Sequence, residues 1–318
     1  MHPRIFIFIL LLIASLASAQ NREILGEYKL GIVGRDTSDI IYQAAHEGAK
    51  AAALDLSNQY SIDVELLIYT PDQDQGSTQS TSLAELFIQN ADGLIISPGN
   101  TESVRSSVQF AIEQGQAVVY FERQLPGIEP LAAILADELE AGRMAGRAIL
   151  PKLPTRGRVA ILTSHSPTPA LEQRLAGLRE VLGFRRIETI VACEPNYRSA
   201  IETLQAAEEA DRNDQIRAWV FLEDWPLLGM PALPWRSGQR PVVAIQSSPS
   251  AFMYVDQGYL DALIVHPYYD WGYQSVTTLI EKLHRDQSPE TPTQLTTPRV
   301  VDWRNTEEYR QNWQRWLR

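Results

Sequence analysis

An adjacent acid and base stand at the end of an apolar run, where their charges could bind a ligand. Residues 118–127 read VVYFERQLPG, so Glu122 and Arg123 follow a strand-like segment and precede a Pro and a Gly that favour a turn. Burial of an unpaired charge is costly, whereas an acid and a base can satisfy each other or a polar ligand. The pair therefore predicts a ligand-binding edge, with a plain surface or interlobe ion pair as the alternative.

Polar and aromatic side chains also follow the ends of other apolar runs. Carboxylates, amides and guanidinium groups satisfy the hydroxyls of a polyhydroxylated ring, and aromatic rings cover its C–H faces. This combination predicts a site for a small sugar-like molecule. The residues concerned are Arg35, Asp36, Asp39, Tyr42, Ser97, Asn100, Glu122, Arg123, Ser164, His165, Asn196, Tyr197, Glu223, Asp224, Trp225, Gln246, His266, Tyr268, Tyr269 and Trp271, and the aliphatic Ile41 stands beside Tyr42.

Catalytic and metal-binding motifs are weak in this sequence. Gly31 and Gly34 follow the first apolar run without the third glycine of a dinucleotide-binding loop, and no nucleophile elbow or phosphate-binding loop occurs. The five histidines show no metal-ligand spacing. Ser97 or Cys193 could serve a hydrolase, but neither has an evident local partner. We therefore expect no catalytic residue, no metal and no cofactor.

Apolar runs that read as strands alternate with segments of helical spacing, which predicts βαβ units and parallel sheets covered on both faces. In the first half, strands are expected at 28–33, 64–69, 93–97 and 117–121, and helices at 41–56, 79–90 and 102–114. A second series follows the interruption at 126–130, with strands at 132–135, 158–163, 188–192, 218–222, 242–246 and 262–266 and helices at 138–150, 169–182 and 198–210. Ligands of such doubly wound sheets bind at the carboxyl ends of the strands, where the polar residues stand.

The length of 318 residues exceeds what one compact core usually serves, so two doubly wound α/β lobes are expected. Residues 1–19 contain one Arg, an apolar run and a small-residue end, the layout of a secretory signal peptide. We expect an exported, periplasmic protein in which 26–135 plus 267–292 form the N-terminal lobe. Residues 136–266 plus 293–318 would form the C-terminal lobe, joined to the first by a hinge of three strands.

Composition excludes some classes of partner. Lys and Arg number 28 against 39 Asp and Glu, and the net charge of −11 disfavours nucleic acid. Cys193 is the only cysteine, so a packed core rather than a disulfide must supply the stability. After the leader no segment offers about 18 consecutive apolar residues, so we expect a chain that does not itself span a membrane. We also expect it to be a monomer.

The C-terminal residues carry an aromatic stripe. Tyr309, Trp313 and Trp316 are spaced by four and three residues, which places them on one face of a helix over 306–318. Packing across the second lobe is the expected role of this stripe. Contact with a partner protein or a membrane interface is the alternative.

The chain resembles the type 1 periplasmic sugar-binding proteins of the ribose-binding class over residues 28–303. The resemblance rests on the order and spacing of YKLGIVG, GLIISPGN, VVYFERQ, ILADELEAGRMAGRAIL, ALEQRLAGLREVL and VVAIQSSPS. It implies a sugar-like ligand, held by hinge closure and delivered to the permease of an ABC transporter. A module that signals to a membrane-bound kinase or chemoreceptor is the alternative. A lac-repressor-type regulator shares the fold, but here the leader stands where its DNA-binding headpiece would be.

The resemblance also implies which residues contact the ligand. The family's acid–Arg pair falls on Glu122 and Arg123, with Glu in place of the usual Asp, and its helix-borne Arg falls on Arg174. The other positions fall on Asp39, Ile41, Tyr42, Asp224, Gln246 and His266. Ile41, Gln246 and His266 depart from the usual aromatic, Asp and Gln, so the identity of the sugar does not transfer. The two Arg forks leave room for an acidic or otherwise modified ligand.

Overall fold

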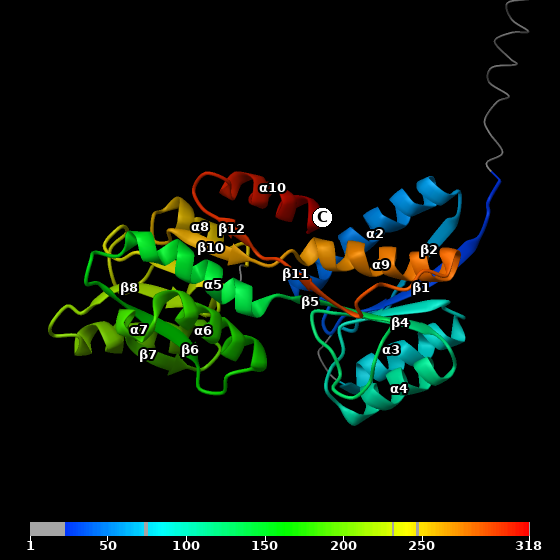
Figure 1. Ribbon diagram of the computed structural model, residues 1–318, viewed down its shortest axis with the longest axis horizontal. Helices are drawn as coiled ribbons and strands as arrows, with labels where there is room; N and C mark the ends of the chain where they lie inside the picture. The colour runs from blue at the N-terminus through cyan, green and yellow to red at the C-terminus, as the bar shows by residue number, and fades with distance from the viewer. Residues whose placement is uncertain (1–22, 73–75, 231, 246–247, 318) are drawn as a thin grey trace, which may run out of the picture.

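The computed structural model describes residues 23–72, 76–230, 232–245 and 248–317, which form two lobes side by side (Figure 1). The expected signal peptide and the expected ligand residue Gln246 lie outside the described residues. In the described part of the chain, each lobe contains a six-stranded sheet with helices on both faces. No helix in this part is long and apolar enough to cross a bilayer.

The sheet of the first lobe is parallel throughout its described strands, which are mostly continuous apolar runs, as strands covered on both faces require. Its order is β11-β5-β4-β3-β1-β2. The strands are β1 (Glu27–Val33), β2 (Asp63–Ile68), β3 (Gly93–Ile96), β4 (Ala117–Phe121), β5 (Ala132–Ala136) and β11 (Thr293–Thr296). Helices α2 (Ile40–Tyr60) and α9 (Tyr268–Arg285) cover one face, and α3 (Gly76–Ile88) and α4 (Glu102–Glu113) cover the other (Figure 1).

The sheet of the second lobe has the order β12-β10-β9-β8-β6-β7, with β12 antiparallel to β10. Its strands are β6 (Arg158–Ser164), β7 (Ile187–Cys193), β8 (Ile216–Phe221), β9 (Val242–Ile245), β10 (Ala262–Val265) and β12 (Arg299–Val301). The helices are α5 (Glu138–Ile149), α6 (Pro169–Leu182), α7 (Tyr197–Ala210) and α8 (Ala251–Asp256), with 3₁₀ turns η1 (Leu150–Lys152), η2 (Phe184–Arg186) and η3 (Trp225–Leu227).

Strand β8 shows how one apolar run serves both faces of a sheet. Trp219 and Phe221 belong to the apolar cluster that contains buried residues of α7 and α8. Ala218 and Val220, which point the other way, belong to the cluster formed with α5 and α6. The continuous apolar pattern therefore reflects a strand with a helical layer on each side.

Three connections between the lobes orient both sheets. Within the described residues, β5 leads into α5, β10 leads into α9 and β11 leads into β12, and each of these steps crosses from one lobe to the other. Since the neighbouring strands run parallel to β5 and β10, the carboxyl ends of both sheets face the junction. The expected fold class, two doubly wound lobes of the type I periplasmic-binding-protein kind, is confirmed.

The lobe boundary near residue 293 differs from the expected one. Strand β11 pairs with β5 in the first sheet, so the first lobe extends to Thr296. The Thr296 hydroxyl donates to the carbonyl oxygen of Leu135 (3.0 Å) and accepts from Nε1 of Trp271 (2.9 Å). A four-residue strand with Thr and Gln side chains lacks an apolar run, so the sequence did not reveal it. The strand at 132–135, which the alternation grouped with the second series, lies inside the first sheet between β4 and β11, as the expected first lobe of 26–135 requires.

In each lobe two helices approach so closely that glycine is needed at the contact. A Cβ at Gly48 of α2 would lie 1.9 Å from the carbonyl oxygen of Tyr269 on α9. A Cβ at Gly142 of α5 would lie 2.0 Å from the carbonyl oxygen of Arg174 on α6. The second contact fixes the position of Arg174 along the axis of α5, next to Gly142.

The C-terminal helix α10 (Thr306–Trp316) lies over the junction and not over the second lobe alone (Figure 1). It contacts α2 of the first lobe and α8 of the second. Trp313 is buried, with its ring centroid 5.9 Å from that of Tyr268, and Trp316 stacks on Tyr269 at 5.5 Å. The aromatic stripe therefore packs against the segment that crosses between the lobes.

Candidate ligand-binding site

The first-lobe half of the site is centred on Glu122, directly after β4. Its φ of 63° lies in the left-handed region, which is uncommon for a residue other than glycine and recurs at functional sites. One carboxylate oxygen, Oε2, accepts from the hydroxyls of Tyr42 (2.6 Å) and Ser97 (2.6 Å). These two bonds fix the carboxylate at the carboxyl edge of the sheet.

Two arginines flank Glu122 and differ in exposure. The side chain of Arg123 is 52% exposed, and its Nε donates to Oε1 of Glu122 (3.2 Å). Arg35 is 16% exposed, donates from Nε to the Tyr42 hydroxyl (2.7 Å) and lies 3.7 Å from Oε1 of Glu122. Arg35 and Ser97 stood among the strand-end residues, but nothing in the sequence showed that they gather around Glu122.

Asp39 and Ile41 begin the helix that positions Tyr42. The Asp39 carboxylate is the N-cap of α2 and accepts from the backbone N–H of Ile41 (3.0 Å). Burial raises the pKa of Asp39, and the bond from Ile41 opposes that shift. Ile41 packs half-buried against the apolar core. Both residues lie near Glu122 in the fold, and their contact with a ligand stays a prediction.

The second-lobe half is organised by Arg174. It stands on α6 in line with Leu171 and Leu178, on the face that packs against the sheet, and is 3% exposed. A guanidinium carries five N–H groups. Five hydrogen bonds join the Arg174 guanidinium to described neighbours. Its Nε and Nη2 donate to the two carboxylate oxygens of Glu138 (2.6 and 2.9 Å), and Nη2 also contacts Nε2 of His266 (3.2 Å). Its Nη1 donates to the Leu222 carbonyl (2.8 Å) and to Glu223 (2.7 Å).

Two acids beside Arg174 have opposite pKa shifts. Burial alone would raise the pKa of Glu138, but the charge of Arg174 and the contact with His266 outweigh it and hold this pKa well below its usual range. Burial, together with the carboxylates of Asp224 and Glu138, raises the pKa of Glu223 to about 7 against the attraction of Arg174. One guanidinium therefore neutralises Glu138 fully and Glu223 only in part.

We expect Glu223→Gln to flatten the pH dependence of thermal stability between about 4.5 and about 7. The folded protein holds the Glu223 proton more tightly than the unfolded chain, so this proton stabilises the fold below 4.5, and the contribution is lost as the pH rises through 7. Melting temperatures of the natural protein and the variant across this window test the expectation, with the exposed Glu202→Gln as control. An equal decline in both proteins would contradict it.

Asp224, His266 and Tyr268 complete the second half. Asp224 is buried, and its Oδ2 accepts from the backbone N–H of Ser248 (2.6 Å). Burial raises the pKa of Asp224, and the Ser248 bond opposes this. The Tyr268 hydroxyl and Nδ1 of His266 are buried without a hydrogen-bond partner among the described residues. The structure thus brings Arg174, Asp224 and His266 together, as expected.

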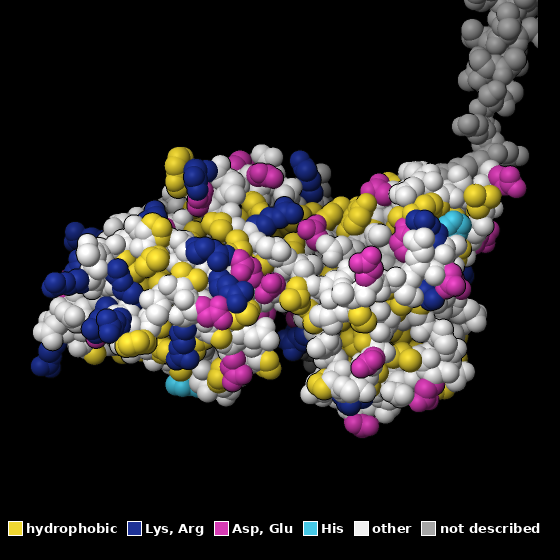
Figure 2. Space-filling view, in the orientation of Figure 1, with side chains coloured by type: hydrophobic (Ala, Val, Ile, Leu, Met, Phe, Trp, Pro, Cys, Tyr) yellow, Lys and Arg dark blue, Asp and Glu magenta, His cyan; other side chains and the backbone are white. Residues whose placement is uncertain are grey.

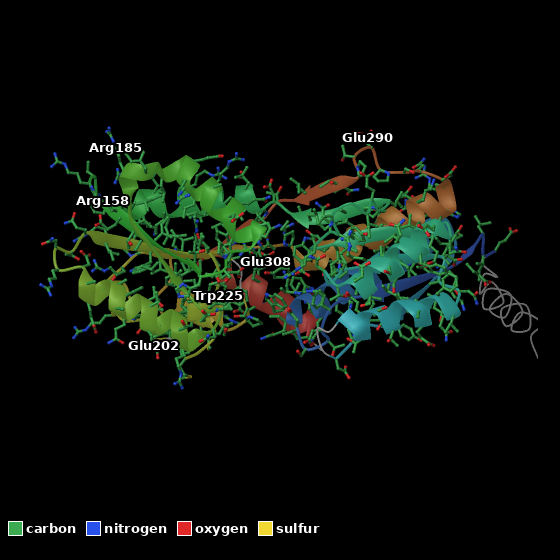
Figure 3. All side chains as sticks on the ribbon, turned by 90° about the horizontal axis from the view of Figure 1, so that it is seen from below. Arg158, Arg185, Glu202, Trp225, Glu290 and Glu308 are labelled. Carbon is green, nitrogen blue, oxygen red and sulfur yellow. The ribbon has the colours of Figure 1, made fainter. Side chains whose placement is uncertain are left out.

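The aromatic candidates divide between packing and the site. Trp271 donates to Thr296 and packs edge-on against Tyr268, so it belongs to the hinge core. Trp225 is half-buried at the start of η3 and lies nearer to the first lobe than the outward-facing Glu202 (Figure 3). Trp225 packs against the apolar clusters of the second lobe, and its contact with a ligand stays a prediction.

A groove of about 560 Å³ lies beneath α10, between α2 and the start of α9. A separate notch between the lobes opens on the side away from α10 (Figure 2). The groove shares His266 and Tyr268 with the second-lobe half, but neither Glu122 nor Arg123 lines it. We place the candidate site at the facing strand ends, because the charged groups gather there.

Nothing among the described residues favours catalysis by the two nucleophiles considered from the sequence. Burial raises the pKa of the Cys193 thiol to about 11, with Glu194 adding to the shift, so the reactive thiolate is scarce at neutral pH. The Ser97 hydroxyl donates to the carboxylate of Glu122. No group of three or more His, Cys, Asp or Glu in the described part is arranged to hold a metal ion.

Parts of the chain are similar in sequence to sugar-binding proteins. The ribose import binding protein of Bacillus subtilis is 26% identical over 109 residues, which is 34% of this chain and 36% of that protein. The D-ribose/D-allose-binding protein of Pseudomonas aeruginosa is 19% identical over 218 residues, 67% of each chain. The matches to the ribose import proteins of B. subtilis and Haemophilus influenzae thus span less than half of their length.

Solved structures agree with the fold. The periplasmic ribose ABC transporter protein from Conexibacter woesei has a TM-score of 0.77 at 20% identity, over 89% of this chain and 94% of that chain. The arabinose-binding protein AraP from Geobacillus stearothermophilus has a TM-score of 0.77 at 18% identity, over 89% and 99%. The family described as periplasmic binding protein domain matches residues 30–286. The chain therefore belongs to the periplasmic binding protein domain family.

Proposed function

We propose that the protein captures a small sugar or sugar-like molecule between its lobes and delivers it to the membrane permease of an ABC transporter. The observation that carries the proposal is the pair of charged half-sites, one around Glu122 and one around Arg174, at carboxyl edges that face the same junction. The relatives named above are import and sugar-binding proteins, which supports transport over signalling to a kinase or chemoreceptor. The same relatives support export to the periplasm, and we expect the protein to act there as a monomer.

Hinge closure would couple binding to the transporter. A ligand that contacts both lobes favours the closed population over the open one, and a membrane partner can distinguish the two shapes. In the first lobe Glu122 is already held by Tyr42 and Ser97, so little side-chain freedom is lost on binding. Arg123, the exposed member of the acid–base pair, is free to move toward the ligand.

The expected contacts divide between the lobes. Asp39, Ile41, Tyr42, Glu122 and Arg123 would contribute from the first lobe. From the second lobe, Asp224, Gln246 and His266 would contact the ligand. Because five bonds to neighbouring groups engage the Arg174 guanidinium, we propose that Arg174 mainly positions Glu138 and Glu223.

Arg123→Ala is expected to weaken sugar binding by about tenfold or more, since a charge-assisted hydrogen bond contributes about 1.5–3 kcal/mol. The melting temperature without ligand should stay unchanged, because the side chain is 52% exposed. A thermal-shift screen over pentoses, hexoses, sugar acids and polyols identifies the ligand, and isothermal titration calorimetry then compares the variant with the natural protein.

Arg158→Ala is the matched control, since Arg158 lies at the outer end of the second lobe (Figure 3). Equal loss of affinity in both variants, or a hit that Arg123→Ala leaves unchanged, would move the site elsewhere. A screen in which no compound raises the melting temperature would contradict the proposed function.

A further inference from the structure

The charge balance of the second-lobe half points to the class of ligand. Two carboxylates, those of Glu138 and Glu223, contact the guanidinium of Arg174, and the carboxylate of Asp224 lies near enough for its charge to act on Glu223; we name these four residues the acidic cluster. The two carboxylates of Glu138 and Glu223 lie 2.6 and 2.7 Å from the guanidinium nitrogens. Negative charge is therefore in excess at this edge of the sheet.

Arg174 is poorly placed to bind an anion. Its Nε and Nη2 form a bidentate pair with Glu138, and Nη1 is shared between the Leu222 carbonyl and Glu223. A carboxylate or phosphate on the ligand would have to displace one of these bonds inside a buried site. The guanidinium of Arg174, which in the sequence left room for an acidic ligand, thus binds carboxylates of the protein itself.

Tyr268 supplies an independent sign that a ligand completes the cluster. Its side chain is 1% exposed, and its hydroxyl has no hydrogen-bond partner among the described residues. Burial raises the pKa of this hydroxyl, and the charges of Asp224, Glu223 and Glu138 raise it further against the opposing charge of Arg174. Buried hydroxyls normally have a partner, and a ligand hydroxyl would provide one.

We propose that the ligand is a small polyol that carries a protonated amine, of the amino-sugar class, with its ammonium group against Glu223 and Asp224 and a hydroxyl against Tyr268. The inference rests on the proposed function and specifies its substrate class. The partly protonated state of Glu223 fits it, since a bound cation would supply the positive charge that the cluster lacks.

Matched pairs of compounds test the proposal. Isothermal titration calorimetry at neutral pH compares D-glucosamine with D-glucose and with N-acetyl-D-glucosamine, D-galactosamine with D-galactose, and D-glucuronate as the acidic sugar. We expect an amine to bind at least about tenfold more tightly than its neutral counterpart, and Glu223→Gln or Asp224→Asn to remove that preference. Glu202→Gln, which removes a carboxylate from the exposed face of α7, should leave it intact. Thermal melts of all three variants show whether they are folded.

The outcomes separate the two proposals. A neutral sugar or the sugar acid that binds as tightly as the amine overturns the amino-sugar class and leaves sugar capture standing. Preference for the amine that persists in both folded acid variants overturns the assignment to the cluster. Failure of every compound to bind overturns both.

Discussion

Arg174→Met is expected to lower the free energy of unfolding of the second lobe by about 3–5 kcal/mol, because it leaves two buried carboxylates without their cation. Glu138 would lose both of its bonds from Arg174, and Glu223 its only described one. Methionine keeps much of the aliphatic volume between Leu171 and Leu178, so the loss reports on charge more than on packing. Urea unfolding monitored by circular dichroism measures the difference.

Removal of the acids as well should restore part of that stability. In the triple variant with Arg174→Met, Glu138→Gln and Glu223→Gln, no unpaired charge is left around the guanidinium position, so it should be more stable than Arg174→Met alone. Arg158→Met removes the exposed partner of Glu188 and should change stability by less than about 1 kcal/mol. If Arg174→Met proved no more harmful than Arg158→Met, the acidic cluster would not be a buried charge network.

The sequence predicted the strand ends well because their signal is local. Glu122 follows a continuous apolar run, and its place at the carboxyl edge follows from the parallel sheet alone. The partners of Arg174 could not be read in this way. Glu138 and Glu223 stand 36 and 49 residues away on other elements, so only the packing of α6 on α5 and β8 reveals that the guanidinium is engaged.

Two other features depend on tertiary context. Strand β11 is short and polar, and it exists because β5 offers an edge and Thr296 bonds to Leu135 and Trp271. The tail showed its helical stripe in the sequence, but the surface that receives it is formed by Tyr268 and Tyr269 at the junction. Periodicity predicted which face of α10 is buried, and it carried no information about what covers that face.

Trp313→Ala is expected to lower the free energy of unfolding by about 3–5 kcal/mol, the usual loss for a buried tryptophan. Trp313 is 2% exposed and packs against Tyr268 (5.9 Å) and Trp316 (5.1 Å), so its removal also loosens the segment that crosses between the lobes. Thermal melts measure the loss, and hydrogen exchange at the start of α9 should become faster. Trp303→Ala, at a residue 77% exposed, should have almost no effect on either measurement. Equal melting temperatures for the two variants would show that α10 merely rests on the surface, whereas the expected difference makes it a structural part of the hinge.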